Sequence, residues 1–205
     1  MGRAAARAQV HAAGRAVQED RRRACRRMGG ALRWWRRGLM HLTVRRLSSA
    51  DLAAYRALHR FGMTESPHGF VDVPATDAAR PDEAVEAVLG RGEGWGAFDG
   101  ERLVGKLTID ALPYPSLAHT FWIHGVYVHP DARGHGASGA LIRAAVEDAI
   151  ARGARRVALW VNEKNAAACK SYERLGFVET GRIPGGIKID GVDVDDVLMT
   201  LVLAT

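Results

Sequence analysis

Hydrophobic positions along the chain follow two periods, and these periods predict the order of strands and helices. Alternating apolar and polar residues, or short apolar runs bounded by turn residues, are typical of strands. This pattern predicts strands over residues 42–47, 95–98, 102–109, 119–128 and 156–161, with two more on either side of Asp190-Gly191. Apolar residues spaced three and four apart predict helices that begin near Leu52, Pro81, Ala137 and Asn165. Residues 62–80 are expected to form a mixed loop.

Turn and cap residues support these boundaries. Asp99-Gly100 is a strong hairpin signal, and Ser48 with Asp51 matches a capping box before the first helix. Gly125 lies inside a predicted strand, where glycine often marks a bulge or the close approach of another molecule. The order of elements predicts an α/β domain built on a mixed sheet.

Charge divides the 205 residues unevenly. The net charge is +6, but residues 1–40 hold 11 arginines against Glu19 and Asp20, and the remainder is mildly acidic. We expect a globular domain over 40–205 and an Arg/Ala-rich extension over 1–39 that is disordered or partly helical. The extension is either a nucleic-acid or membrane-surface arm using Trp34 and Trp35, or a solvated tail. A further alternative is that it is not natively translated, with Met28 or Met40 as the true start.

Several classes of protein are disfavoured by composition. Two cysteines, Cys25 and Cys169, do not form a disulfide framework, which favours a reducing compartment. No apolar run is long enough to span a membrane, and no secretory signal is present, so we expect a cytoplasmic protein. The histidines and cysteines lack metal-ligand spacing, so no metal is predicted.

The stretch from Val126 to Ser138 carries the clearest chemistry. An apolar strand ends at Pro130, a short loop with Arg133, Gly134 and Gly136 follows, and a helix then begins. Glycines let a ligand approach the backbone, and a helix N-terminus presents free N–H groups to an anion. The arrangement suits the pyrophosphate of coenzyme A. A P-loop is excluded because no Lys-Ser/Thr pair follows Gly136.

The glycine spacing alone also satisfies the dinucleotide fingerprint, because Gly139 follows Gly136 at the required distance. Two features of the surrounding sequence disfavour that alternative. Pro130 interrupts the approach to the loop, and the next strand ends in Trp160-Val161-Asn162 without the acidic residue that would bind a ribose.

These segments resemble the GNAT family of N-acetyltransferases. Arg133-Gly134-His135-Gly136-Ala137-Ser138 is similar to its acyl-CoA-binding signature, Arg/Gln-x-x-Gly-x-Gly/Ala, with Ser138 departing from the usual small residue. Val126 to Pro130 resembles its central strand, and Asn165 with Tyr172 to Phe177 resembles its second cofactor motif. The resemblance covers residues 40–205 and implies a mixed, mostly antiparallel central sheet flanked by helices, the acyl-CoA N-acyltransferase fold.

The resemblance also implies an activity: direct transfer of an acetyl group from acetyl-CoA to a primary amine of a small molecule or a protein N-terminus. The backbone of Val126, Tyr127 and Val128 would pair with the pantetheine arm, and Asn165 would bind the same arm. The pyrophosphate would be held by Arg133, Gly134, His135, Gly136, Ala137 and Ser138. Tyr172 would protonate the departing thiolate. Monomer and homodimer stay open.

The general base is less well defined by sequence. Where family members often carry a glutamate on the central strand, this chain has Trp122 and His124. His124 is the candidate base, directly or through water, against the alternative of a plain surface histidine. Glu65 is a second candidate, and Cys169 is expected only to pack. Acceptor contacts are expected from residues 62–80, 110–120 and 182–192, which include Glu65, His68, Asp72, Tyr114 and Lys188.

A different class of function competes with the enzyme. The chain could instead be a non-catalytic acyl-CoA-binding module that the basic arm tethers to nucleic acid, a partner that we do not expect for the enzyme. The joint presence of Asn165 and Tyr172 favours the enzyme.

Overall fold

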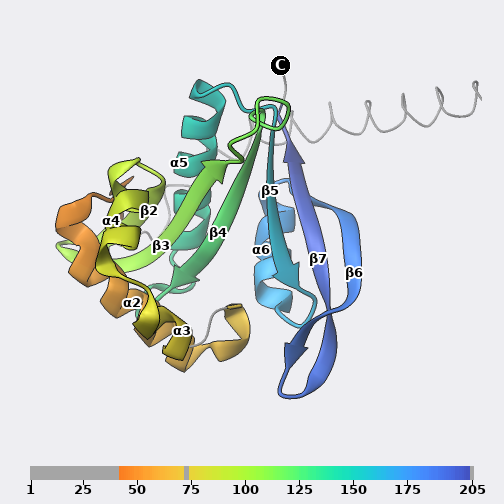
Figure 1. The fold of residues 1–205 in the computed structure, drawn as a ribbon, viewed down its shortest axis with the longest axis horizontal. Helices are drawn as coiled ribbons and strands as arrows, with labels where there is room; N and C mark the ends of the chain where they lie inside the picture. Colours follow the sequence, from red (N-terminus) through yellow and green to blue (C-terminus); the bar gives the residue numbers. More distant parts are fainter. Residues whose placement is uncertain (1–41, 72–73, 204–205) are drawn as a thin grey trace, which may run out of the picture. The chain divides into compact units, whose positions relative to one another are not determined.

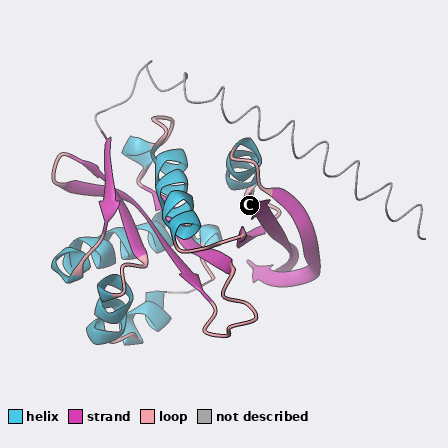
Figure 2. Cartoon of the chain, turned by 90° about the horizontal axis from the view of Figure 1, so that it is seen from above, coloured by secondary structure: helices cyan, strands magenta, loops and turns pink. Residues whose placement is uncertain are grey.

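The computed structural model describes residues 42–71 and 74–203. The arginine-rich extension expected over 1–39, with Cys25, Trp34 and Trp35, lies outside the described residues, as does Asp72. The described chain is built on a seven-stranded sheet with helices on both faces (Figures 1 and 2).

The strands follow the order β1-β2-β3-β4-β5-β7-β6 across the sheet. Their bounds are β1 (Leu42–Arg46), β2 (Gly94–Asp99), β3 (Arg102–Ala111), β4 (Thr120–Val128), β5 (Arg156–Asn162), β6 (Val178–Ile189) and β7 (Val192–Val202). Neighbouring strands are antiparallel except β4 and β5, which are parallel. The predicted mixed, mostly antiparallel sheet flanked by helices is therefore confirmed.

Two apolar cores hold helices against the two faces of the sheet. The larger core joins the sheet to α5 (Ala137–Ala151) and α6 (Ala166–Arg174), and Leu141, Leu159 and Phe177 are fully buried in it. The smaller core lies under α2 (Leu52–Glu65) and α4 (Asp82–Gly90). Each fully buried leucine or phenylalanine contributes about 1.5–3 kcal/mol, so both layers are firmly attached.

Residues 62–80 are not the continuous loop that the sequence pattern predicts. Helix α2 runs on to Glu65, and a 3₁₀ turn at Pro67–Gly69 and helix α3 (Pro74–Ala79) follow. Gly62 is buried, and a Cβ there would lie 2.8 Å from the Phe70 ring and 3.0 Å from the Tyr127 ring. This glycine lets α2 pack closely on β4, so tertiary packing extends the helix beyond its apolar pattern.

A bulge in β4 decides where this strand leaves β5. Lys106 pairs with Tyr127 and Thr108 pairs with His124, so β4 has one more residue than β3 over this stretch. Gly125, the glycine that the sequence marks, has φ +56° inside the bulge. β4 pairs with β5 only over Thr120–Trp122, and Figure 1 shows the two strands diverging below that point. Past Trp122, the edge of β4 that faces β5 has no strand partner among the described residues.

Candidate functional site

The loop between β4 and α5 has the backbone conformation that an anion site needs. Gly134 and Gly136 have φ +79° and +83°, values that side-chain-bearing residues rarely adopt. Within the described chain, the N–H groups of residues 134–139 donate no backbone hydrogen bond, whereas Ala140 already bonds to Gly136. A Cβ added at Gly134 would meet nothing within 4 Å, so the space beside the loop is open. Free N–H groups at a helix N-terminus fit a pyrophosphate such as that of acetyl-CoA.

Arg133, expected to face this pyrophosphate, points elsewhere in the structure. Its guanidinium contacts both oxygens of Glu65, at 3.0 and 2.5 Å, and its Nε donates to the Val128 carbonyl at 3.0 Å. The Glu65 carboxylate therefore already forms an ion pair with the guanidinium that was expected to bind a phosphate. Because a guanidinium carries five N–H donors and the Arg133 side chain is 46% exposed, a pyrophosphate could share Arg133 with Glu65 or displace this carboxylate.

Glu65 joins the cofactor loop to the segment after α2. Besides Arg133, it accepts hydrogen bonds from the Tyr127 hydroxyl at 2.9 Å and the Ser66 hydroxyl at 2.7 Å. The Arg133 hydrogen bonds lower the pKa of Glu65 to about 2. Burial, followed by the contact with Glu65, raises the pKa of Tyr127 to about 12. A carboxylate with so low a pKa is a weak proton acceptor, which disfavours Glu65 as the general base.

His124 has a carboxylate partner that the sequence analysis missed. Its Nε2 lies 3.1 Å from Asp110 Oδ1, and the imidazole is half exposed. Asp110 pairs with Trp122 across β3 and β4, so it lies diagonally beside His124 on the same face of the sheet. The only sequence signal was the alternation of the two strands, and the long connection at residues 112–119 hides their register.

Helix α6 positions the two residues of the second predicted cofactor motif. The Asn165 side chain caps α6 by accepting from the Ala168 N–H at 3.2 Å, and its amide nitrogen donates to no residue that the structure describes. Tyr172 is buried against Phe177, with ring centroids 5.9 Å apart. Burial raises the pKa of Tyr172 well above its ordinary value, so the phenol stays protonated. Burial also raises the pKa of Cys169, which lies one helical turn before Tyr172 and stays a thiol.

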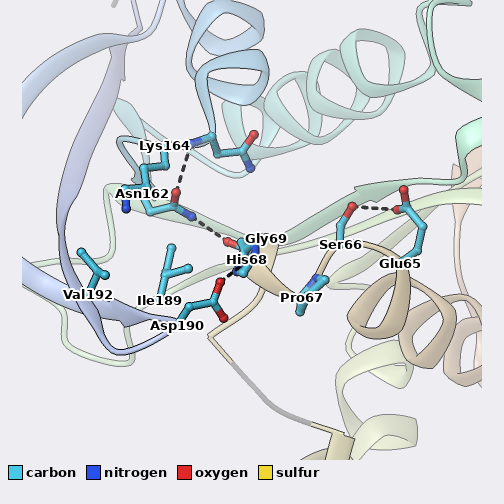
Figure 3. Close-up of a pocket in the computed structure, with 11 residues that line it drawn as sticks. Glu65, Ser66, Pro67, His68, Gly69, Asn162, Lys164, Ile189, Asp190 and Val192 are labelled. Carbon is cyan, nitrogen blue, oxygen red and sulfur yellow. Dashed lines mark hydrogen bonds and ion pairs between the residues drawn. The ribbon is translucent and has the colours of Figure 1, made fainter.

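A cavity of about 600 Å³ lies beside these groups. It is lined by Glu65, Ser66, Pro67, His68, Gly69, Asn162, Lys164, Asn165, Ile189, Asp190 and Val192 (Figure 3). The Asn162 side chain donates to the His68 carbonyl at 2.8 Å, and His68 Nε2 lies 3.4 Å from Asp190. These contacts bring the 62–80 and 182–192 segments together. Residues 110–120, which were also expected to contact the acceptor, do not line this cavity. His124, on β4, does not line it either.

The described part of the chain offers neither a metal cluster nor a membrane-spanning helix. No cluster of three or more His, Cys, Asp or Glu side chains placed to hold a metal ion occurs within residues 42–71 and 74–203. In the same ranges, no helix has both the length and the apolar character needed to cross a membrane.

Parts of this chain are similar in sequence to known proteins. One curated relative, an uncharacterized N-acetyltransferase of Methanocaldococcus jannaschii, is 45% identical over 67 residues, 33% of this chain and 30% of that protein. Another, an L-methionine sulfoximine/L-methionine sulfone acetyltransferase of Pseudomonas aeruginosa, is 38% identical over 61 residues, 30% of this chain and 36% of that protein. The match thus spans about a third of the length of these curated relatives.

Similarity to solved structures extends over most of the chain. A proposed acetyltransferase from Salmonella typhimurium, solved with its cofactor acetyl-CoA, superposes with a TM-score of 0.70 at 19% identity, covering 80% of this chain and 95% of that one. At this identity the likeness establishes the fold alone. The model of the acetyltransferase (GNAT) family matches residues 59–177, which include the bulged strand, the glycine loop and the helix of Tyr172. The chain therefore belongs to the acetyltransferase (GNAT) family.

Proposed function

We propose that the protein transfers an acetyl group from acetyl-CoA directly to a primary amine, on a small molecule or a protein N-terminus. The observation that carries this proposal is the pairing of two features: the unbonded N–H groups of residues 134–139 and the open edge of β4. A pyrophosphate on the loop would place an extended, amide-bearing arm along that edge. Family membership supports acetyl transfer, and the acceptor is part of the proposal.

The chain's own residues divide the binding work by position. Val126, Tyr127 and Val128 offer backbone groups to the pantetheine amides in the manner of an added strand. The loop from Arg133 to Ser138, with the N-terminus of α5, holds the pyrophosphate. The Asn165 amide nitrogen, unused in the cap, donates to the same arm.

His124 and Tyr172 handle the two protons of the reaction. His124 takes the proton that the amine loses, directly or through a water, while Asp110 orients the imidazole. Acetyl-CoA, when bound, supplies the acetyl group as an activated thioester. Tyr172, kept protonated by its buried position, transfers its hydroxyl proton to the departing sulfur. A catalyst of this kind needs no covalent acyl-enzyme, which agrees with the un-ionised thiol of Cys169.

The cavity lined by Ser66 to Gly69 and by Ile189, Asp190 and Val192 is the proposed site for the body of the acceptor. His124 does not line it, so the proposal requires the acceptor amine to extend out of the cavity to this base. Its volume of about 600 Å³ is in the range of sites for small molecules. An α-amine with a pKa near 8 costs about 1.4 kcal/mol to deprotonate at pH 7, against about 4.6 kcal/mol for a lysine-like amine. That value is the pKa of a peptide N-terminus, so the cost of deprotonation favours a protein N-terminus over a lysine-like amine. The Pseudomonas aeruginosa relative is instead named for amino-acid derivatives, so both kinds of α-amine belong to the proposal.

A thiol-release assay tests the proposal. The full chain is incubated with acetyl-CoA and a panel of amino acids, polyamines and peptides with free N-termini, and the products are checked by mass spectrometry. We expect amine-dependent thiol release and a singly acetylated product. Binding of acetyl-CoA without turnover of any amine would contradict an enzyme and favour a binding module.

A further inference from the structure

Lys106, in the middle of β3, is an unusual core residue. It is 1% exposed and is among the largest of the fully buried side chains of the described residues. Burial lowers the pKa of its amine to about 7, partly offset by Asp77, while Arg80 acts in the same direction as burial. An apolar side chain of similar length would fill this space without that cost. The contacts of its nitrogen therefore decide what this lysine contributes.

The nitrogen binds the bulge of β4. Lys106 Nζ donates to the Gly125 carbonyl at 3.1 Å, and it lies 4.8 Å from the Tyr55 ring centroid and 5.9 Å from that of Phe70. A bulge disrupts the hydrogen bonds of the strand ladder, and the carbonyl of the exposed Gly125 accepts a side-chain donor in place of a strand partner. The lysine supplies the missing donor from the opposite strand.

The same contact lies between the two halves of the proposed site. Gly125 comes three residues after Trp122, the last residue of β4 that pairs with β5, and directly before Val126–Val128, the part of the open edge that is expected to bind the cofactor. Phe70 follows the Pro67–Gly69 turn that lines the cavity. One buried nitrogen thus contacts the strand expected to bind the cofactor and the segment expected to contact the acceptor.

We propose that Lys106 is a positioning residue whose hydrogen bond to the Gly125 carbonyl holds the β4 bulge in the shape that opens Val126–Val128 to acetyl-CoA. The inference rests on the proposed function, since it assigns a purpose to the geometry of that binding edge. Lys106 itself touches neither substrate.

Lys106→Met is the decisive variant, because methionine fills the space but donates no hydrogen bond. The matched control is Leu107→Met, the fully buried neighbour whose side chain belongs to the larger core, away from the cluster under α2. Acetyl-CoA affinity is measured by calorimetry on the full chain, global stability by thermal unfolding, and local order by hydrogen–deuterium exchange.

For Lys106→Met we expect a roughly tenfold or larger rise in Kd and a fall of about 10- to 100-fold in kcat/KM, because a small displacement of a binding element is enough. Faster exchange should be confined to residues 123–128, with thermal stability kept.

Two results would overturn the inference. One is a Lys106→Met protein that binds acetyl-CoA as tightly as the Leu107→Met control. The other is weaker binding that accompanies unfolding or faster exchange across the whole sheet, because the lysine would then be only a structural requirement. A wild-type chain that binds no acetyl-CoA contradicts the proposed function itself, whereas wild-type binding with an unaffected Lys106→Met contradicts only the role of Lys106.

Discussion

At the scale of single residues, the neighbours of each ionisable side chain decide which chemistry it can perform. Glu65 and His124 were both candidates for the base. The Arg133 contact lowers the pKa of Glu65 to about 2, so this pair stabilises the fold above the ordinary carboxyl range near 4.5 and loses its effect as pH falls toward 2. His124 instead faces Asp110 and keeps half of its side chain exposed. The roles of His124 as proton acceptor and of the buried Tyr172 as proton donor are part of the proposed mechanism.

Replacing Tyr172 with phenylalanine tests the donor role. The variant Tyr172→Phe removes one oxygen and should lower kcat by roughly 10²–10⁴, because a positioned proton donor contributes that much. Acetyl-CoA affinity should stay near wild type, since the proposed binding contacts come from other residues. Steady-state kinetics and calorimetry measure the two quantities.

Tyr114→Phe is the matched control, because Tyr114 is 60% exposed and does not line the cavity, although its segment was expected from sequence to contact the acceptor. An unchanged kcat for Tyr172→Phe would remove the phenol from the mechanism. The phenol would then be only a packing partner of Phe177.

At the scale of elements, glycines at the two ends of α5 serve different purposes. Gly136 precedes the helix with φ +83°, and Gly153 follows it with φ +89°. Both positions are strained for any other residue, at a cost of about 1–2 kcal/mol. Only the first lies beside the free N–H groups of the loop. Both positions therefore require a glycine backbone, but only a substitution at Gly136 is expected to weaken acetyl-CoA binding.

The variant Gly136→Val should abolish measurable acetyl-CoA binding. Its branched side chain would block the approach of a ligand to the loop backbone and would disturb the left-handed conformation. Gly153→Val is the control, because it introduces similar strain where a Cβ would meet nothing within 4 Å. Calorimetry with acetyl-CoA and thermal unfolding are measured on both. Equal losses of affinity in the two variants would mean that strain, rather than blocked approach, explains the result.

At the scale of the whole molecule, the site is assembled from segments far apart in the chain. The cavity is lined by residues 65–69, by 162, 164 and 165, and by 189, 190 and 192. Glu65 connects it to the cofactor loop at 133–138 through the ion pair with Arg133. The cavity, the cofactor loop and the two described apolar cores are all formed by residues within 42–203. We therefore expect catalysis not to need the basic extension.

Removing residues 1–39 should leave kcat/KM for acetyl-CoA and the acceptor within about twofold of the full chain, since substitutions and changes away from a site are usually small in effect. Both proteins are compared in the thiol-release assay and in nucleic-acid binding at several salt concentrations. A large loss of turnover in the shortened chain would show that the extension belongs to the catalytic unit. Absent turnover in both proteins, with tight and steeply salt-dependent nucleic-acid binding by the full chain, would support the binding-module alternative.

Local rules explain why much of the fold and the cofactor loop could be predicted. Strand alternation, the turns at Asp99-Gly100 and Asp190-Gly191, and the glycines of the loop depend on residues adjacent in sequence, so their signals are visible without a structure. Residues 62–80 were wrongly predicted as a loop because helix α2 extends past Gly62 by packing on Tyr127 and Phe70, a distant contact.

The sequence by itself determined the order of elements, the glycine loop and the likeness to a family. Only the tertiary structure decided that Asp110 pairs with His124, that Glu65 pairs with Arg133, and that Lys106 donates a hydrogen bond to the Gly125 carbonyl. The physical reason is range: backbone conformation is set largely by neighbouring residues, whereas each of these pairs joins separate elements. Their partners depend on strand register and helix docking, which the packing of the two cores sets across the whole chain.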